Sequence, residues 1–198
     1  EQHTNAPKAA LQRMRRNVDI FCKALDDGAE AIVMTASGCG AMVRDYAHLL
    51  RDDPHYAARA QRVVEHTRDL AEVIRDEAIT DVEWRGLDGH RLAFHPPCTL
   101  QHGQKLMGVV EGLLGSLGVQ MTPVRDAHLC CGSAGAYSIL QPELSKALRT
   151  RKLERLEAGA PEQILTANIG CLHHLQAGTA KRVRHWIEFL DDALPASA

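Results

Sequence analysis

The sequence predicts an α/β fold of two related repeats, with mostly parallel strands flanked by helices. Two observations support this prediction. Apolar runs typical of strands alternate with amphipathic stretches typical of helices along the 198 residues, and this alternation favours parallel sheets. In addition, a helix, a glycine turn, an apolar strand and a Gly-Cys ending occur twice, as KALDDGAEAIVMTASGC and as RLEAGAPEQILTANIGC.

The first half of the chain begins with a predicted amphipathic helix over residues 7–27, where apolar side chains recur at helical spacing and Pro7 suits the first turn. The next segment, EAIVMTASGCG, contains a short β-branched run and ends in small residues around Cys39. This pattern is typical of a buried parallel strand that meets its loop. Two more helices are predicted, over residues 41–51 and 54–77.

A polar turn, WRGLDGH at residues 84–90, is the best candidate for a domain boundary. It separates residues 1–84, which we expect to be the C-terminal part of a first repeat, from residues 91–198, which we expect to be a second and complete repeat. The elements predicted for the second repeat are strands at 91–98, 119–124 and 162–171, and helices at 103–118, 142–159 and the final segment VRHWIEFLDDAL.

The first repeat is expected to be incomplete. Cys131 precedes Cys171 by 40 residues, and 40 residues back from Cys39 lies before residue 1. The cysteine pair of the first repeat would therefore fall upstream of Glu1, which leaves Cys39 without partner cysteines of its own. On this count the chain is expected to be the C-terminal piece of a longer protein.

Composition narrows the classes of function. With 45% hydrophobic residues and a net charge of −2, the chain predicts a globular core and no basic surface for nucleic acid. It contains no apolar run near the ~20 residues that a membrane-spanning helix needs, and its first ten residues lack the pattern of a signal peptide. We therefore expect a cytoplasmic protein, whose cysteines stay reduced and are more often ligands or catalysts than disulfides.

Four of the six cysteines indicate a site. They all lie where a predicted strand gives way to a loop or helix, and the C-terminal ends of parallel strands meet at one edge of a sheet. Soft sulfur ligands select zinc or iron-sulfur clusters, and the small residues beside the adjacent pair leave room for a bulky cofactor. The alternative is that these thiols are ordinary core residues. The four are Cys98, Cys130, Cys131 and Cys171.

Neighbouring histidines have two interpretations. They could orient the sulfur ligands or receive a proton, or they could be ordinary hydrogen-bonded loop residues. Cys131 with His128 is the only candidate for a thiol nucleophile beside a base, and no nucleophile elbow supports it. Cys22 lies on the apolar face of a predicted helix and is expected in the core. The histidines in question are His95, His102, His128 and His173.

These cysteines carry a resemblance. A cysteine, 31 intervening residues, Cys-Cys-Gly and then 38 residues to a further cysteine resembles the cysteine-rich domain named for its CCG motif, found in heterodisulfide reductases and in lactate- and glycolate-oxidising systems. The segments FHPPCTLQHGQKL, HLCCGSAGAYSILQPELS, ANIGCLHHL and VRHWIE, with TASGCGAMVRDY in the first half, are most similar to the iron-sulfur subunits of glycolate oxidases. The resemblance covers nearly the whole chain.

The resemblance implies electron transfer. In that family a flavin subunit oxidises glycolate to glyoxylate and the iron-sulfur subunit carries the electrons onward, so this chain is not expected to be catalytic alone. Two ferredoxin-like 4Fe-4S clusters precede this region in the family, and their cysteine runs do not occur in this sequence. Attachment to the inner membrane through partner subunits is a further expectation.

The resemblance also implies a ligand set. A complete repeat of the heterodisulfide reductase type binds its cluster through a lone cysteine, the CCG pair and a closing Cys-x-x-Cys. Carried over, the ligands are Cys98, Cys130, Cys131 and Cys171, and the closing cysteine falls at His174, which departs from the pattern. Histidine can replace thiolate on iron and raise the potential. The alternative is a scaffold that docks a flavoprotein partner and either binds zinc or carries no metal.

Overall fold

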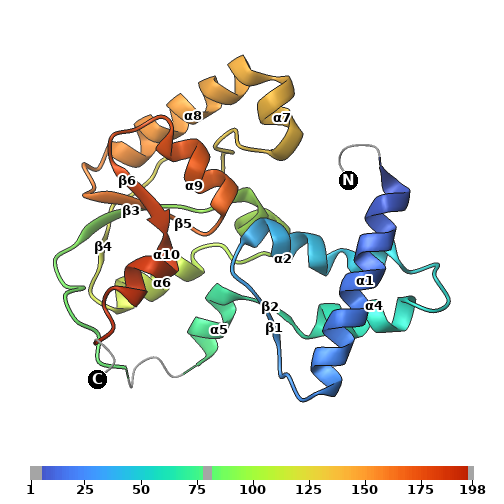
Figure 1. The fold of residues 1–198 in the computed structure, drawn as a ribbon. Coiled ribbons are helices and arrows are strands. Elements are labelled where there is room, and N and C mark those ends of the chain that lie inside the picture. Colours follow the sequence, from blue (N-terminus) through green and yellow to red (C-terminus); the bar gives the residue numbers. More distant parts are fainter. Residues whose placement is uncertain (1–5, 78–81, 196–198) are drawn as a thin grey trace. The chain divides into compact units, whose positions relative to one another are not determined.

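A computed structural model describes residues 6–77 and 82–195. The chain divides into two compact units, Glu1–Val73 and Ile74–Ala198. Both units combine helices with a sheet, and every strand pair within the described ranges is parallel, which confirms the predicted α/β class. Figure 1 shows the order of the elements, coloured along the chain from blue to red. That the two units are related repeats stays a prediction.

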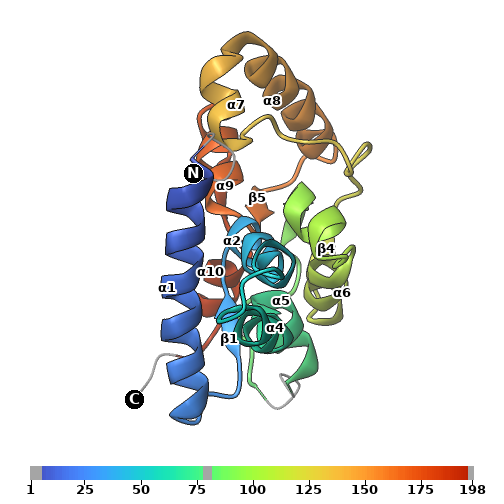
Figure 2. The same ribbon diagram turned by 90° about the vertical axis from the view of Figure 1, so that its right-hand side faces the viewer.

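The first unit contains a two-stranded parallel sheet, β1-β2, in which Ile32 pairs with Thr67. Its long N-terminal helix, α1 (Figure 2), packs on α4 and buries one side chain per turn, as its periodicity predicts. Cys22 is buried in this core, as expected. The elements are α1 (Pro7–Asp26), β1 (Ile32–Met34), α2 (Ser37–Arg44), α3 (Tyr46–Leu49), α4 (Ala57–Glu65), β2 (Thr67–Asp69) and α5 (Leu70–Asp76). The boundary between the two units, after Val73, falls within α5.

Two predicted helices of the first half are wrong in detail. The stretch 54–77 is interrupted by β2, because its backbone pairs with β1, beginning with the hydrogen bond from Ile32 N to the carbonyl of His66 (2.8 Å). The helix expected at 41–51 instead starts at Ser37, so Cys39 lies inside a helix and not at a strand end. A strand of three residues is too short to show an alternating pattern of apolar and polar residues in the sequence.

The second unit is built on a four-stranded parallel sheet in the order β4-β3-β5-β6. The central pair brings together segments about 70 residues apart, since His95 pairs with Thr166 across β3 and β5. The elements are β3 (Arg91–His95), a π-helical turn (Thr99–Gly103), α6 (Val109–Ser116), β4 (Gln120–Met121), α7 (Gly135–Leu140), α8 (Pro142–Glu157), β5 (Gln163–Thr166), α9 (Ile169–Gln176), β6 (Arg182–His185) and α10 (Trp186–Asp191).

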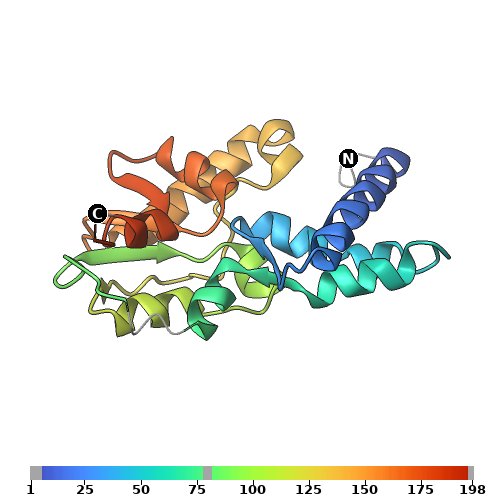
Figure 3. The same cartoon turned by 60° about the horizontal axis from the view of Figure 1, so that its bottom comes forward.

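The sheet of the second unit has two covered faces, and α8 and α9 lie on one of them (Figure 3). Alternate residues of the strands share a face, so Ala93 and Ile164 pack there against apolar side chains of α8 and α9. Phe94 points the opposite way and, with Glu111 of α6, lines a cavity on the other face. By the same alternation His95 and Thr166 belong to the face that α8 and α9 cover.

Several boundaries in the second half differ from prediction. The final segment is not wholly helical, because Val183 and Arg184 form part of β6 and the helix begins only at Trp186. The strand expected at 162–171 ends at Thr166, so Cys171 lies in the first turn of α9. In addition, α6 is shorter than the predicted helix, β4 is shorter than the predicted strand, and α7 was not foreseen.

No helix in the described part of the chain is long and apolar enough to cross a membrane.

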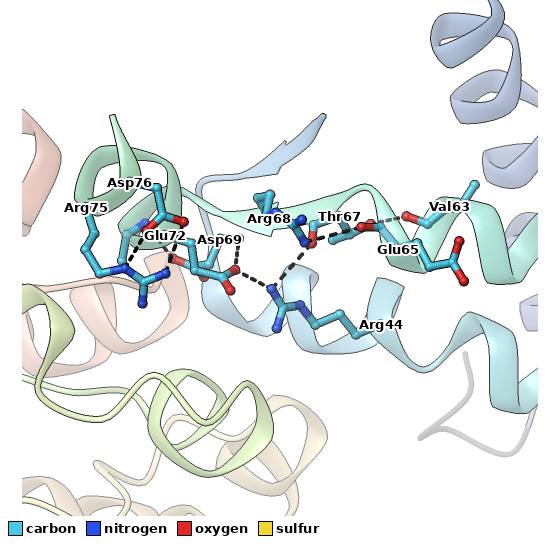
Figure 4. Close-up of polar contacts among 10 residues, drawn as sticks. Arg44, Val63, Glu65, Thr67, Arg68, Asp69, Glu72, Arg75 and Asp76 are labelled. Atoms are coloured by element: carbon cyan, nitrogen blue, oxygen red, sulfur yellow. Dashed lines mark hydrogen bonds and ion pairs between the residues drawn. The ribbon is translucent and has the colours of Figure 1, made fainter. Parts of the chain in front are cut away.

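An ion pair and three hydrogen bonds hold the end of β2 in the first unit (Figure 4). Arg44 of α2 bonds the carboxylate of Glu72 and donates to the carbonyl of Thr67. Glu72 also accepts from the backbone N–H of Asp69 (2.8 Å), and the Thr67 hydroxyl donates to the carbonyl of Val63 (2.7 Å). These contacts satisfy buried backbone groups where the strand gives way to α5.

Candidate metal centre

Cys98 follows β3 directly after Pro96 and Pro97, at the start of the π-helical turn. Proline cannot continue the ladder because it lacks the N–H, so the strand ends at this point. The carboxamide of Gln101 then donates to the carbonyls of Pro96 (2.9 Å) and Ala127 (3.2 Å). The half-buried Cys98 is thereby anchored beside the loop that carries the cysteine pair.

Cys130 and Cys131 lie in the loop between β4 and α7, and the glycine that follows them determines the path of that loop. Gly132 has φ +93°, in the left-handed region, and its N–H donates to the sulfur of Cys130 (3.2 Å). The hydroxyl of Ser145, buried on α8, donates to the Gly132 carbonyl (2.8 Å). Figure 2 shows α8 beside α7, the helix that this loop enters.

Cys171 is buried in the first turn of α9 and receives two polar contacts. The hydroxyl of Ser133 and the carboxamide of Asn168 each donate to its sulfur at 3.5 Å. The thiol of Cys131 in turn donates to the Ser133 hydroxyl (3.3 Å). Donors directed at sulfur stabilise the thiolate form, which is the form that binds metals.

The four cysteines lie close enough to shift one another's pKa values, Cys98 with Cys130, Cys130 with Cys131 and Cys131 with Cys171. The neighbouring thiols of Cys131 and Cys98 lower the pKa of Cys130. The interaction with Cys130 raises the pKa values of Cys98 and Cys131. The pKa of Cys171 falls to about 7, chiefly through its interaction with Cys131. The structure thus brings together all four cysteines singled out in the sequence.

A buried histidine lies among these sulfurs. A ring nitrogen of His95 and the sulfurs of Cys131 and Cys171 all lie within 4.8 Å of one another, and all three residues are buried. Burial lowers the pKa of His95 to about 3, and the charge of Lys152 acts in the same direction. The imidazole is therefore neutral at physiological pH and retains a lone pair on one ring nitrogen.

A buried cation also adjoins the site. Lys152 of α8 is 2% exposed and donates to the carbonyls of Asp126 (3.0 Å) and Ala127 (3.1 Å), in the loop before the cysteine pair. With Cys130 it lines a small cavity of about 10 Å³. Desolvation lowers the pKa of Lys152, and the electrostatic influence of Cys131 and Cys130 opposes that shift. A buried ammonium beside sulfur ligands balances the negative charge that such ligands carry.

His174, the other histidine of interest, is engaged elsewhere. Its Nε2 lies 3.4 Å from both the hydroxyl and the carbonyl oxygen of Ser145. It also lies against Gly132, where an added β-carbon would come within 3.2 Å of that nitrogen. The structure thus places His174 between α8 and the cysteine loop, and its role as a ligand stays a prediction.

Sequence reasoning gave His95 only a supporting role, although its place three residues before Cys98, at the end of an apolar strand, could have marked it. The polar residues around the sulfurs carry no comparable signal, because they meet the cysteines only in the folded unit. They are Ser133, Ser145, Lys152 and Asn168. Cys39 is exposed on α2 of the first unit.

Comparison with known proteins identifies the family of the domain that contains the site. Residues 92–176 match the family model described as CCG, Cysteine-rich domain. Lactate utilization protein A of Bacillus velezensis is 31% identical over 177 residues, which cover 87% of this chain and 68% of that protein. The chain belongs to the CCG cysteine-rich domain family.

The CCG domain match includes all four clustered cysteines as well as His95 and His174. The match to two other relatives extends beyond the residues of this domain. The glycolate oxidase iron-sulfur subunit of Escherichia coli is 49% identical over 98% of this chain. The probable glycolate oxidase iron-sulfur subunit of Bacillus subtilis is 29% identical over 89% of this chain. This chain spans 47% of the first protein and 39% of the second, which is less than half the length of either.

Proposed function

We propose that this chain is part of the iron-sulfur subunit of a glycolate-oxidising enzyme, and that its second unit holds a cluster through Cys98, Cys130, Cys131 and Cys171. The observation that carries the proposal is the convergence of these four thiols at one place within the CCG domain. Relatives named as glycolate oxidase iron-sulfur subunits supply the class of enzyme. His174 stands in the place of the closing cysteine, where the family pattern implies a further ligand.

The donor chemistry fits an iron-sulfur cluster. Thiolates are the ligands that such clusters take, and hydrogen bonds to the sulfurs help to set the potential. Here the Gly132 N–H, the Ser133 hydroxyl and the Asn168 carboxamide all donate to cysteine sulfurs. Lys152 adds a buried positive charge beside the anionic ligands.

When bound, a cluster supplies one-electron redox chemistry at this site. The four thiolates would hold it, and the surrounding donors would stabilise their negative charge. The chain carries no dinucleotide fingerprint of the G-x-G-x-x-G kind. The oxidation of glycolate would therefore belong to a flavin-containing partner subunit, and the cytoplasm would keep the thiols reduced.

We also propose that the two units are related repeats, with residues 1–84 from a first repeat and residues 91–198 forming a second. The sequence echo around Cys39 and Cys171 supports this relation. In both units the matching cysteine lies in the first turn of a helix that follows a parallel strand.

Anaerobic reconstitution with ferrous iron and sulfide tests the cluster. The protein should take up both elements and gain the visible absorbance of sulfur-to-iron charge transfer. Cys131→Ser should lose most of that absorbance, whereas Cys39→Ser, which changes an exposed cysteine of the first unit, should change it little. Equal loss in the two variants would refute the ligand assignment. Glycolate-dependent dye reduction by this chain alone would refute its role as an electron-transfer subunit.

Zinc is a second candidate, and one observation favours it. Two atoms bound to a single zinc ion at ~2.0–2.3 Å lie less than about 4.6 Å apart. The ligand atoms of His95, Cys131 and Cys171 all lie within 4.8 Å of one another, and sulfur with imidazole nitrogen is a donor set that zinc takes. A colourless protein with one zinc per chain, and no uptake of iron and sulfide, would make the second unit a zinc-held scaffold for docking a flavoprotein.

A further inference from the structure

The orientation of His95 is set by the sheet itself. His95 ends β3 and pairs in register with Thr166 of β5, on the face that α8 and α9 cover. Its Nδ1 lies 3.0 Å from the Thr166 hydroxyl oxygen, and the side chain is 1% exposed. Strand pairing thus fixes both the ring and its hydrogen-bond partner.

The same ring lies within reach of two sulfurs. A nitrogen of His95 and the sulfurs of Cys131 and Cys171 all lie within 4.8 Å of one another. Metal-bound histidines usually donate from one ring nitrogen to a neighbouring oxygen while the other nitrogen binds the metal. In His95, Nδ1 lies beside the hydroxyl oxygen of Thr166, and the sulfurs of Cys131 and Cys171 lie near the ring.

We infer that His95 supplies a nitrogen ligand to the metal centre held by Cys131 and Cys171. In this assignment Nδ1–H donates to the Thr166 hydroxyl, and Nε2 would supply the lone pair that binds the metal. The inference rests on the proposed metal centre and deepens it, since it adds imidazole to a set of thiolates. It also assigns the nitrogen ligand to His95 and not to His174, whose Nε2 lies near Ser145.

A nitrogen ligand changes the charge of the site. The buried imidazole of His95 would add a neutral donor to the anionic thiolates. A nitrogen ligand among thiolates raises the potential of an iron-sulfur centre. His95 would thus make the centre easier to reduce than one bound by thiolates alone.

Nitrogen hyperfine coupling tests the assignment directly. Full-length chain with ¹⁵N-labelled histidine is loaded anaerobically with iron and sulfide, reduced, and examined by pulsed electron paramagnetic resonance. The wild type should show a nitrogen coupling of a directly bound ligand. His95→Gln should lose this coupling, while the matched control His174→Gln should keep it. A coupling that persists in H95Q, or is lost in H174Q, overturns the inference.

Cobalt(II) loading separates this inference from the proposed function. Cobalt bound at the site should give paramagnetically shifted imidazole proton resonances, which H95Q loses and H174Q keeps. If the wild type binds cobalt with this pattern but takes up no iron and sulfide, the iron-sulfur proposal fails and the His95 assignment holds. If the wild type shows no bound histidine nitrogen with either metal, the His95 assignment fails.

A further variant covers the case in which H95Q does not fold, as judged by circular dichroism. Thr166→Val keeps the imidazole and the β-branched shape of the neighbouring residue but removes the hydroxyl that holds Nδ1. It should alter the nitrogen coupling of the bound ligand. An unchanged coupling in T166V would show that the ring near Thr166 is not the one bound, and would overturn the inference.

Discussion

A β-carbon added to Gly132 would lie 2.4 Å from the carbonyl oxygen of Ser145. The glycine also has φ +93°, a conformation that other residues rarely adopt. The hydroxyl of Ser145 also donates to the Gly132 carbonyl. The cysteine loop is therefore held against α8 by a hydrogen bond as well as by this close approach. The third letter of the CCG motif is therefore explained by a close backbone approach as well as by the turn.

Gly132→Ala should destabilise the protein by about 1–3 kcal/mol, through the strained φ and the clash with Ser145. Urea unfolding followed by circular dichroism measures the change. Gly115→Ala is the matched control, because Gly115 lies in α6 with nothing within 4 Å of an added β-carbon. That variant should be neutral or slightly stabilised. Equal stability of the two variants would contradict the role given to Gly132.

Ser145→Ala should cost about 1–3 kcal/mol, because it leaves the buried carbonyl of Gly132 without the hydroxyl that donates to it. The loosened loop should also release metal faster, which a chelator competition assay measures. Ser138→Ala is the control, since Ser138 is only partly buried and its hydroxyl makes an exposed hydrogen bond to a carbonyl of the same short helix. Metal release at the wild-type rate in S145A would show that this bond does not hold the loop.

Lys152→Met should make the reduction potential of a bound cluster more negative, because a buried positive charge that favours the added electron is lost. Redox titration under anaerobic conditions measures the potential. Lys146→Met, an exposed lysine on the same helix, should leave it nearly unchanged. A potential that stays the same in K152M would mean that the ammonium serves only to hold the carbonyls of Asp126 and Ala127.

Asp192 should make stability depend on acid pH. The hydrogen bond from the buried Arg184 guanidinium (2.6 Å) lowers the pKa of Asp192 from its ordinary value of 3.8. A carboxylate with a lowered folded pKa stabilises the protein above its unfolded pKa, and that stabilisation is lost as the pH falls through the folded pKa. Asp192→Asn should therefore have a lower Tm than wild type at neutral pH, and the difference should shrink below pH 3.8.

Asp191→Asn is the control for this pH dependence, because Asp191 is exposed one residue away on α10. Its Tm should follow that of the wild type across the acid range. A Tm difference for D192N that is the same at every pH would show that the ion pair with Arg184 contributes nothing to the acid response.

Long periodic segments were predictable from the sequence, and short strands were not. The 20 residues of α1 and the 16 of α8 give enough turns for an apolar pattern to appear or for a proline start to be recognised. β2 and β6 have three and four residues, and each directly precedes a helix whose pattern continues into it. Only pairing with a neighbouring strand distinguishes such segments.

The cysteines were predictable as a group because strand ends of a parallel sheet meet at one edge. Cys171 lies in the first turn of α9 and not at the end of β5, yet its sulfur still lies near that of Cys131. The histidine was harder to choose. His174 was favoured by its position in the family pattern, whereas the proximity of His95 to two sulfurs depends on its pairing with Thr166, which no local pattern encodes.

The pairing of β3 with β5 has a consequence for how the chain folds. β3 pairs on one side with β4, which follows soon after it, but its other partner, β5, follows only after α7 and α8, about 70 residues later. Contacts so distant in sequence form slowly, because a long loop must close before they stabilise anything. During synthesis on the ribosome, Ala93 of β3 can pack with Ile164 of β5 only after α8 has been made. The candidate metal centre is therefore completed late, because Cys171 of α9 follows the other three cysteines and both central strands in the chain.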